Sequence, residues 1–195
     1  QAASATFTQN IYRWYVDNDT ENVTDPWSAT AGIDLAENTG ITIIPVANDP
    51  PSTTQKIRLR TNITVNTATI TGGSRYFKLQ YRAGTDSDCS TGSWTDVAPA
   101  ATWEYASSSV TDDTTLTVAK LTGTNELETY SKVKPANTPT GTVSLGDNIE
   151  FDFHIVGTNS VSSTRYLFRV VESTSDGTGT TARASYSSNC PVLTT

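Results

Sequence analysis

The stretch K-I-R-L-R-T-N-I-T-V-N-T-A-T-I, residues 56–70, decides the fold class of this chain. One face of its alternating pattern is apolar or β-branched: Ile57, Leu59, Thr61, Ile63 and Val65. The other face is polar or charged: Lys56, Arg58, Arg60, Asn62 and Thr64. A period of two residues predicts a β-strand of an antiparallel sheet, with one buried face and one face in water.

Further strand patterns lie on both sides of this stretch. The strongest span residues 11–16, 77–82, 149–155 and 164–171, and weaker ones span 40–46, 93–97 and 116–121. No segment carries a 3.6-residue apolar period, so we predict an all-β fold, an elaborated antiparallel β-sandwich of about ten strands. The Pro- and Thr-rich stretch 134–142 leaves too few residues after it for a second sandwich, which makes residues 11–195 a single expected domain.

Residues 1–10, Q-A-A-S-A-T-F-T-Q-N, form a separate N-terminal segment in this prediction. Ala3, Ala5 and Phe7 share one alternating face of it. The pattern suits a short first strand, a free tail or a strand donated to a neighbouring copy. In strand addition the backbone hydrogen bonds give affinity and the alternate side chains give register, so these three residues are the strand-exchange candidates.

Composition narrows the function classes. The formal net charge of -7 disfavours nucleic acid and anionic membranes as partners, because both need basic patches. No apolar run approaches the ~18 residues of a membrane span, so we expect no membrane insertion. The chain starts at Gln1 and contains no Met. A cleaved signal peptide would explain this and predicts a secreted, extracellular or cell-surface protein; a trimmed chain is the alternative.

The two cysteines, Cys89 and Cys190, predict one disulfide in a secreted chain. It would close a loop of about 100 residues, which the chain-entropy model rates at roughly 4 to 5 kcal/mol. A bond between subunits is the alternative. The chain has no Cys-x-x-Cys and one His, so we expect neither a metal site nor a cofactor.

Candidate catalytic groups are few. Glu150, Asp152 and His154 share one strand face and could serve a metal or acid–base site, but a solvated strand face explains them more simply. No nucleophile motif accompanies His154, so we expect no catalytic residues and no enzyme. Two acidic groups have the spacing of Ca²⁺ ligands or hydrated turns, and hydrated turns are the simpler interpretation: Asp17, Asp19 and Glu21, and Asp86 with Asp88.

Three Asn-x-Ser/Thr sequons begin at Asn18, Asn22 and Asn62, and Asn62 falls on the expected wet face of its strand. These three are the glycosylation candidates. The aromatic residues Trp14, Tyr15, Trp27, Trp94 and Trp103 could form a platform for stacking sugars, although packing in the core is the simpler role for most of them.

Two stretches resemble fibronectin type III and related Ig-like modules. The first is Phe77–Arg82 followed by Trp94–Val97, which resembles their middle strands. The second is Thr164–Val170, which resembles their penultimate strand, in which a Tyr makes a corner contact. The resemblance covers about a third of the chain and implies an Ig-like sandwich.

A longer resemblance is to an uncharacterised module of surface proteins from uncultivated bacteria. It rests on Arg13-Trp14-Tyr15, Asp25-Pro26-Trp27, Leu35–Asn38, Arg58-Leu59-Arg60, Leu79-Gln80-Tyr81, Cys89 and the Pro-Val-Leu-Thr end. That module implies a second Cys within Tyr166–Phe168, where this chain has Leu167, so Cys190 is the only candidate partner of Cys89. The resemblance implies an extracellular structural or adhesive role and supplies no activity.

Two functions follow as hypotheses. In the first, the chain is a subunit of a cell-surface filament or pilus, a homopolymer held by β-strand exchange through residues 1–10. In the second, it is a monomeric Ig-like adhesin module that binds surface glycans or protein. The first predicts regular fibres, and the second predicts a stable monomer with an exposed aromatic cluster.

Overall fold

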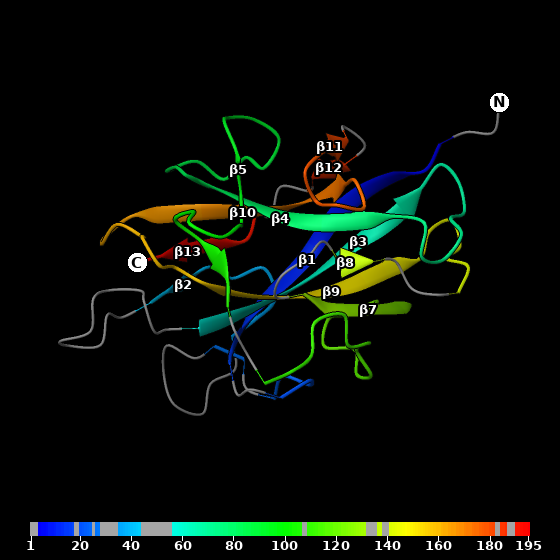
Figure 1. Cartoon of the computed structure of the whole chain (residues 1–195), viewed down its shortest axis with the longest axis horizontal. Coiled ribbons are helices and arrows are strands. Elements are labelled where there is room, and N and C mark those ends of the chain that lie inside the picture. Colours follow the sequence, from blue (N-terminus) through cyan, green and yellow to red (C-terminus); the bar gives the residue numbers. More distant parts are fainter. Residues whose placement is uncertain are drawn as a thin grey trace.

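A computed structural model of the chain describes residues 4–17, 20–24, 26–27, 35–43, 56–106, 109–131, 136–137, 141–181, 184–186 and 190–195. These residues form β-strands, turns and loops, and none of them is helical. The predicted all-β sandwich is confirmed, with two sheets that enclose one core (Figure 1).

The first sheet has the strand order β12-β1-β3-β9-β6, and β7 also pairs with β9. Its strands are β1 (Thr6–Val16), β3 (Lys56–Asn66), β6 (Glu104–Tyr105), β7 (Glu126–Ser131), β9 (Asn148–Val156) and β12 (Ala184–Tyr186). The long strands β1, β3 and β9 carry the sheet, and Figure 1 shows them side by side. The decisive stretch of the sequence is therefore the central strand β3.

The second sheet has the order β2-β13-β10-β4-β5, with β11 on β10 and β8 on β4. Its strands are β2 (Ile41–Thr42), β4 (Tyr76–Ala83), β5 (Thr95–Asp96), β8 (Ala136–Asn137), β10 (Arg165–Ser173), β11 (Thr180–Thr181) and β13 (Val192–Thr194). The central pair β4 and β10 is antiparallel over eight partnered residues, from Tyr76 to Ala83.

Both sheets are mixed, where a purely antiparallel sandwich was predicted. Three pairs are parallel: β1 with β12, β2 with β13, and β7 with β9. Each of them adds a short or irregular strand at the side of a sheet. Chain direction in such a pair depends on where the connecting loop returns, and alternation within one strand carries no information about that.

The core is filled by inward residues of both sheets, and aromatic rings join the sheets. Phe7 of β1 meets Phe77 of β4 edge-on at 4.9 Å, and Trp14 meets Phe168 of β10 at 5.4 Å. Trp103 also packs on Phe168, at 5.3 Å. Edge-to-face pairs at such distances add to the free energy of burial. The aromatic residues thus fix how one sheet lies over the other.

The expected boundary after residue 10 falls inside β1. Thr6–Gln9 pairs with Ile63–Asn66 of β3, and Tyr12–Val16 pairs with Ile57–Thr61, with a register shift between Gln9 and Tyr12. A bulge of this kind inserts unpaired residues and bends the strand. In the described residues, the end of the N-terminal segment is therefore the first half of one long strand.

The face of the first sheet that was expected to lie in water is covered by protein. Five side chains on it are fully buried and form what we call the charged layer: Arg58, Arg60, Glu150, Asp152 and His154. The expected solvated face for the Glu150–His154 group is therefore wrong. Two loops, residues 20–24 and 116–124, lie over the layer, and the second replaces a strand that was predicted at 116–121.

The charged layer is held by ion pairs and by backbone groups of the covering loops. Asp152 forms ion pairs with two arginines, Arg58 and Arg60, and its Oδ2 lies 2.7 Å from Arg60 Nε. Arg60 also pairs with Glu150, whose Oε1 lies 2.9 Å from Arg60 Nη1. Glu150 accepts the N–H groups of Lys120 and Leu121 at 3.0–3.1 Å, and Arg58 donates to the Glu21 carbonyl at 2.9 Å. Buried charges are tolerated when they are paired and hydrogen-bonded in this way.

Candidate functional site

The first half of β1, Thr6–Gln9, occupies a slot between two strands. It pairs antiparallel with β3 on one side and parallel with β12 on the other, where Phe7–Gln9 partners Ala184–Tyr186. The inward side chains Ala5, Phe7 and Gln9 are all buried. Two of the strand-exchange candidates, Ala5 and Phe7, thus fill the core of their own chain, and Ala3 lies outside the described residues.

Gln9 connects the two sheets. Its Oε1 accepts the backbone N–H of Val170 in β10 at 2.6 Å, and its Nε2 lies 4.0 Å from Cys89 Sγ. The side chain is only 2 % exposed. A buried amide needs such partners, because an unsatisfied polar group costs about 1–3 kcal/mol. The backbone of Gln9 therefore belongs to the first sheet, and its side chain is held by Val170 of the second sheet.

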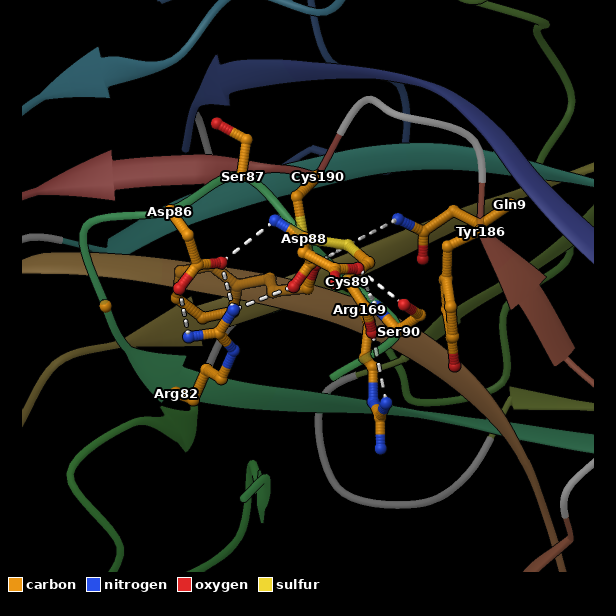
Figure 2. Close-up of a disulfide and its surroundings, with 12 residues drawn as sticks. Gln9, Arg82, Asp86, Ser87, Asp88, Cys89, Ser90, Arg169, Tyr186 and Cys190 are labelled. Carbon is orange, nitrogen blue, oxygen red and sulfur yellow. Dashed lines mark hydrogen bonds and ion pairs between the residues drawn. A yellow bond between two sulfur atoms is a disulfide. The ribbon is translucent and has the colours of Figure 1, made fainter. Parts of the chain in front are cut away.

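Cys89 and Cys190 form the predicted disulfide within one chain, with a Cα–Cα distance of 5.5 Å. Figure 2 shows the bond beside Gln9 and Tyr186. Both cysteines are buried in a small cluster with Leu167. The structure thus pairs Cys89 with Cys190 of the same chain, where a bond between subunits was the alternative.

The loop that leads to Cys89 is organised by Arg82. The guanidinium pairs with Asp86 through two hydrogen bonds and donates to the Asp88 carbonyl at 2.7 Å (Figure 2). It also lies against Gly84 and Gly92, where an added Cβ would meet it. The hydrogen bonds from Arg82, with those from the loop backbone, lower the pKa of Asp86 to about 2. Asp86 and Asp88 thus belong to a loop closed by its own hydrogen bonds.

A row of cations and rings continues along the outer face of the second sheet. The Arg169 guanidinium lies 4.4 Å from the ring centre of Trp94 and 5.4 Å from that of Tyr186, and Arg82 lies 5.1 Å from Trp94. Arg169 donates to Gln80 Oε1 and to the Cys89 carbonyl. Partial burial, with the neighbouring charge of Arg82, lowers the pKa of Arg169, and the Tyr186 ring opposes this shift. The row places two guanidinium groups, those of Arg82 and Arg169, on the same ring of Trp94.

The glycosylation candidates have different positions. Asn62 is fully buried and its Oδ1 accepts the Ile11 N–H at 3.1 Å, so the expected wet position for it is wrong. Because its amide nitrogen is also buried, the folded chain cannot carry a glycan there. Asn22 is half-buried and donates to Thr117 Oγ1 at 2.9 Å. Asn18 lies outside the described residues.

The aromatic residues do not gather into a sugar platform. Trp14, Tyr15 and Trp103 are buried. Trp27 is half-buried against the core and donates its backbone N–H to the Trp14 carbonyl. Trp94 is half-buried beneath the two guanidinium groups. Packing in the interior explains Trp14, Tyr15 and Trp103, whereas Trp27 and Trp94 keep part of their surface exposed.

The acidic and histidine candidates belong to the covered face. His154 Nε2 lies 3.0 Å from Asp17 Oδ2, so Asp17 extends the charged layer. The carbonyl of Glu21 binds Arg58, and Asp19 lies outside the described residues. Within the described part of the chain, no group of three or more His, Cys, Asp or Glu side chains could hold a metal ion.

Comparison with protein-family models, curated proteins and solved structures yields no match. Among the described residues, no helix is long and apolar enough to cross a membrane. The candidate site therefore rests on the geometry of this chain alone.

Sequence reasoning missed Gln9 and the charged layer. The sequence does place Gln9 on the inward face with Ala5 and Phe7, and a polar residue at an inward position is a signal for a buried partner. The partner itself, the Val170 N–H, is 161 residues away and only the tertiary structure identifies it.

Proposed function

We propose that this chain is an extracellular structural module that assembles into a cell-surface filament, a homopolymer joined by exchange of the first half of β1. The observation that carries the proposal is the placement of Thr6–Gln9 in a slot between β3 and β12, with alternate side chains in the core. The same slot in a second copy offers identical contacts, which is the condition for strand exchange.

The bulge in β1 supports this joint. It separates Thr6–Gln9 from Tyr12–Val16, so the first half can leave its slot while the second half stays paired with β3. Unpaired residues at a bulge can absorb the change in backbone direction. Exchange then replaces each contact within a chain by the same contact between chains, and the net cost is the loss of translational freedom.

The strand order supports an Ig-like module. The order β1-β3-β9-β6 corresponds to A-B-E-D of Ig constant-type sandwiches, and β13-β10-β4 corresponds to G-F-C. The Val161 N–H donates to Tyr166 Oη at 3.0 Å across the turn before β10, as in the corner contact expected for the penultimate strand. Modules of this architecture are common in cell-surface proteins, and the disulfide is compatible with a secreted chain.

A cross-linking experiment on the full chain tests the exchange. Thr8 and Thr64 are paired across β1 and β3, so we propose to mix chains carrying Thr8→Cys with chains carrying Thr64→Cys. If the first half of β1 enters a second copy, mild oxidation gives covalent dimers on non-reducing gels. Negative-stain electron microscopy of the unmodified protein should then reveal regular fibres.

Random collisions are controlled by pairing Thr8→Cys with Val161→Cys, since Val161 is 63 % exposed and lies between β9 and β10, outside the strands that border the slot. Cross-linking that does not exceed this control, together with dispersed particles under the microscope, would exclude strand exchange. Deletion of residues 1–10 is a poorer test, because it would also remove Phe7 from the core.

A second candidate is an adhesin module, favoured by the half-buried Trp94 beside Arg82 and Arg169. Stacked cations and a ring suit an acidic sugar, because Arg169 donates to the uncharged Gln80 Oε1 and Cys89 carbonyl and a carboxylate would supply a counter-charge. The protein should then bind to an array of acidic glycans, and the Trp94→Ala variant should not bind. A blank array would remove this candidate.

A further inference from the structure

Among the described residues, no strand pairs with the edge of β10 between its partners β13 and β11. β13 pairs with Arg165–Leu167, and β11 pairs with Glu172–Ser173. Between them, Val170 uses both of its backbone groups on side chains: its N–H donates to Gln9 Oε1 at 2.6 Å, and its carbonyl accepts Tyr186 Oη at 3.2 Å. Gln9 belongs to the first sheet, so a residue of β1 closes an edge of the second sheet.

Between residues 3 and 11, the alternating series that contains the inward residues has a single amide, Gln9. Its members are Ala3, Ala5, Phe7, Gln9 and Ile11. A slip of one residue would turn the whole series outward. A slip of two residues keeps the inward face but places Phe7 or Ile11 at the position opposite Ile63, where Gln9 now lies. Neither side chain can accept a hydrogen bond, so the Val170 N–H would be buried without a partner.

We propose that Gln9 determines the register of the exchanged strand, and that a second copy of this chain is accepted because its donor strand carries an amide two residues after Phe7. This inference rests on the proposed function. An unsatisfied buried N–H disfavours each slipped register by a factor on the order of ten to a hundred. The joint between copies therefore has one register, as a regular filament requires.

The test uses Gln9→Met, which keeps the length of the side chain and removes the acceptor, in the full chain. Two cross-linking pairs report the register. Thr8→Cys with Thr64→Cys reports the native one, and Thr8→Cys with Asn66→Cys reports the slip that brings Ile11 opposite Ile63. In the native register residues 8 and 66 are diagonal neighbours, too far apart for an unstrained disulfide. We expect Gln9→Met to lower the ratio of native to slipped cross-links about tenfold.

Amide hydrogen exchange on the same variants tests whether the hydrogen bond from Val170 to Gln9 forms, independently of its effect on strand register. Gln9→Met should speed exchange of the Val170 amide about tenfold and leave the Leu79 amide, which donates to Tyr105 Oη, unchanged. Thr6→Ala, at an exposed position on the outward face of the same strand, is the matched control and should alter neither the ratio nor the exchange rate.

The outcomes distinguish the two proposals. Cross-links between copies with an unchanged native-to-slipped ratio in Gln9→Met overturn the role of Gln9 and leave strand exchange standing. An absence of cross-links above the Val161→Cys control, with Gln9 intact, overturns strand exchange and the role of Gln9 together.

Discussion

Single residues with buried charge give this sandwich an unusual second layer. Arg58, Arg60 and Asp152 are fully buried on the side of the first sheet that faces away from the core. Each meets a counter-charge, and the covering loops supply backbone groups to Arg58 and Glu150. The layer therefore ties loops 20–24 and 116–124 to the strands, in addition to the buried apolar side chains of Val23, Leu116 and Leu121.

Removal of one charge from the layer should destabilise the chain strongly. Arg60→Met leaves Glu150 and Asp152 with a missing partner in a buried site, and we expect a loss of about 3–5 kcal/mol in the free energy of unfolding. Urea unfolding followed by tryptophan fluorescence measures it. Arg13→Met is the control, since its 3.8 Å contact with Glu37 is partly exposed and should contribute under about 1 kcal/mol. Equal losses for the two variants would contradict this account.

Buried tyrosines predict a loss of stability at high pH. Burial raises the pKa of Tyr12 and of Tyr186 from 10.0 to about 12, and it raises the pKa of Tyr105 as well. The unfolded chain then releases these protons first, so the stabilisation is complete below pH 10 and is lost as the pH rises toward 12. Phenolate absorbance should show these tyrosines titrating late and together with unfolding. Titration of all tyrosines near pH 10 in the folded state would refute the expectation.

At the scale of elements, β1 consists of two halves with separate partners. Its second half pairs with β3 and accepts the Trp27 N–H at the Trp14 carbonyl, while its first half lies between β3 and β12. Because the bulge separates them, the two halves can differ in stability although they are continuous in sequence.

The first half should contribute to stability as a core strand. Phe7→Ala removes a buried ring that packs on Phe77 at 4.9 Å, and we expect it to cost about 3–5 kcal/mol. Thr8→Ala changes the outward neighbour and should cost less than about 1 kcal/mol. Thermal unfolding of both variants compares them. A small effect of Phe7→Ala would mean that this segment lies outside the core of the chain in solution.

At the scale of the whole molecule, the disulfide closes most of the second half of the chain. Cys89 and Cys190 are separated by 101 residues, and the loop between them includes β9 and β10. Since both cysteines are buried, the bond also fixes the segment before β13 against the loop that Arg82 organises.

Loss of the Cys89–Cys190 disulfide should lower the free energy of unfolding, and it should not change the covalent state of the protein, which is a single chain. In the chain-entropy model, Cys89→Ala with Cys190→Ala costs roughly 4 to 5 kcal/mol through the unfolded state, which denaturant titration measures. Without added cysteines, the chain should run as a monomer on non-reducing denaturing gels. A covalent dimer there would indicate a bond between subunits and contradict the arrangement described here.

The sequence by itself determined the all-β class, the strand that begins at Lys56, the strands predicted at 77–82, 149–155 and 164–171, and the disulfide. These follow from alternation within a strand and from a count of two cysteines. Only the tertiary structure decided that Arg58 and Asp152 are buried and that Gln9 caps Val170. A strand pattern states which side chains share a face, but what covers that face depends on loops whose contacts are distant in sequence.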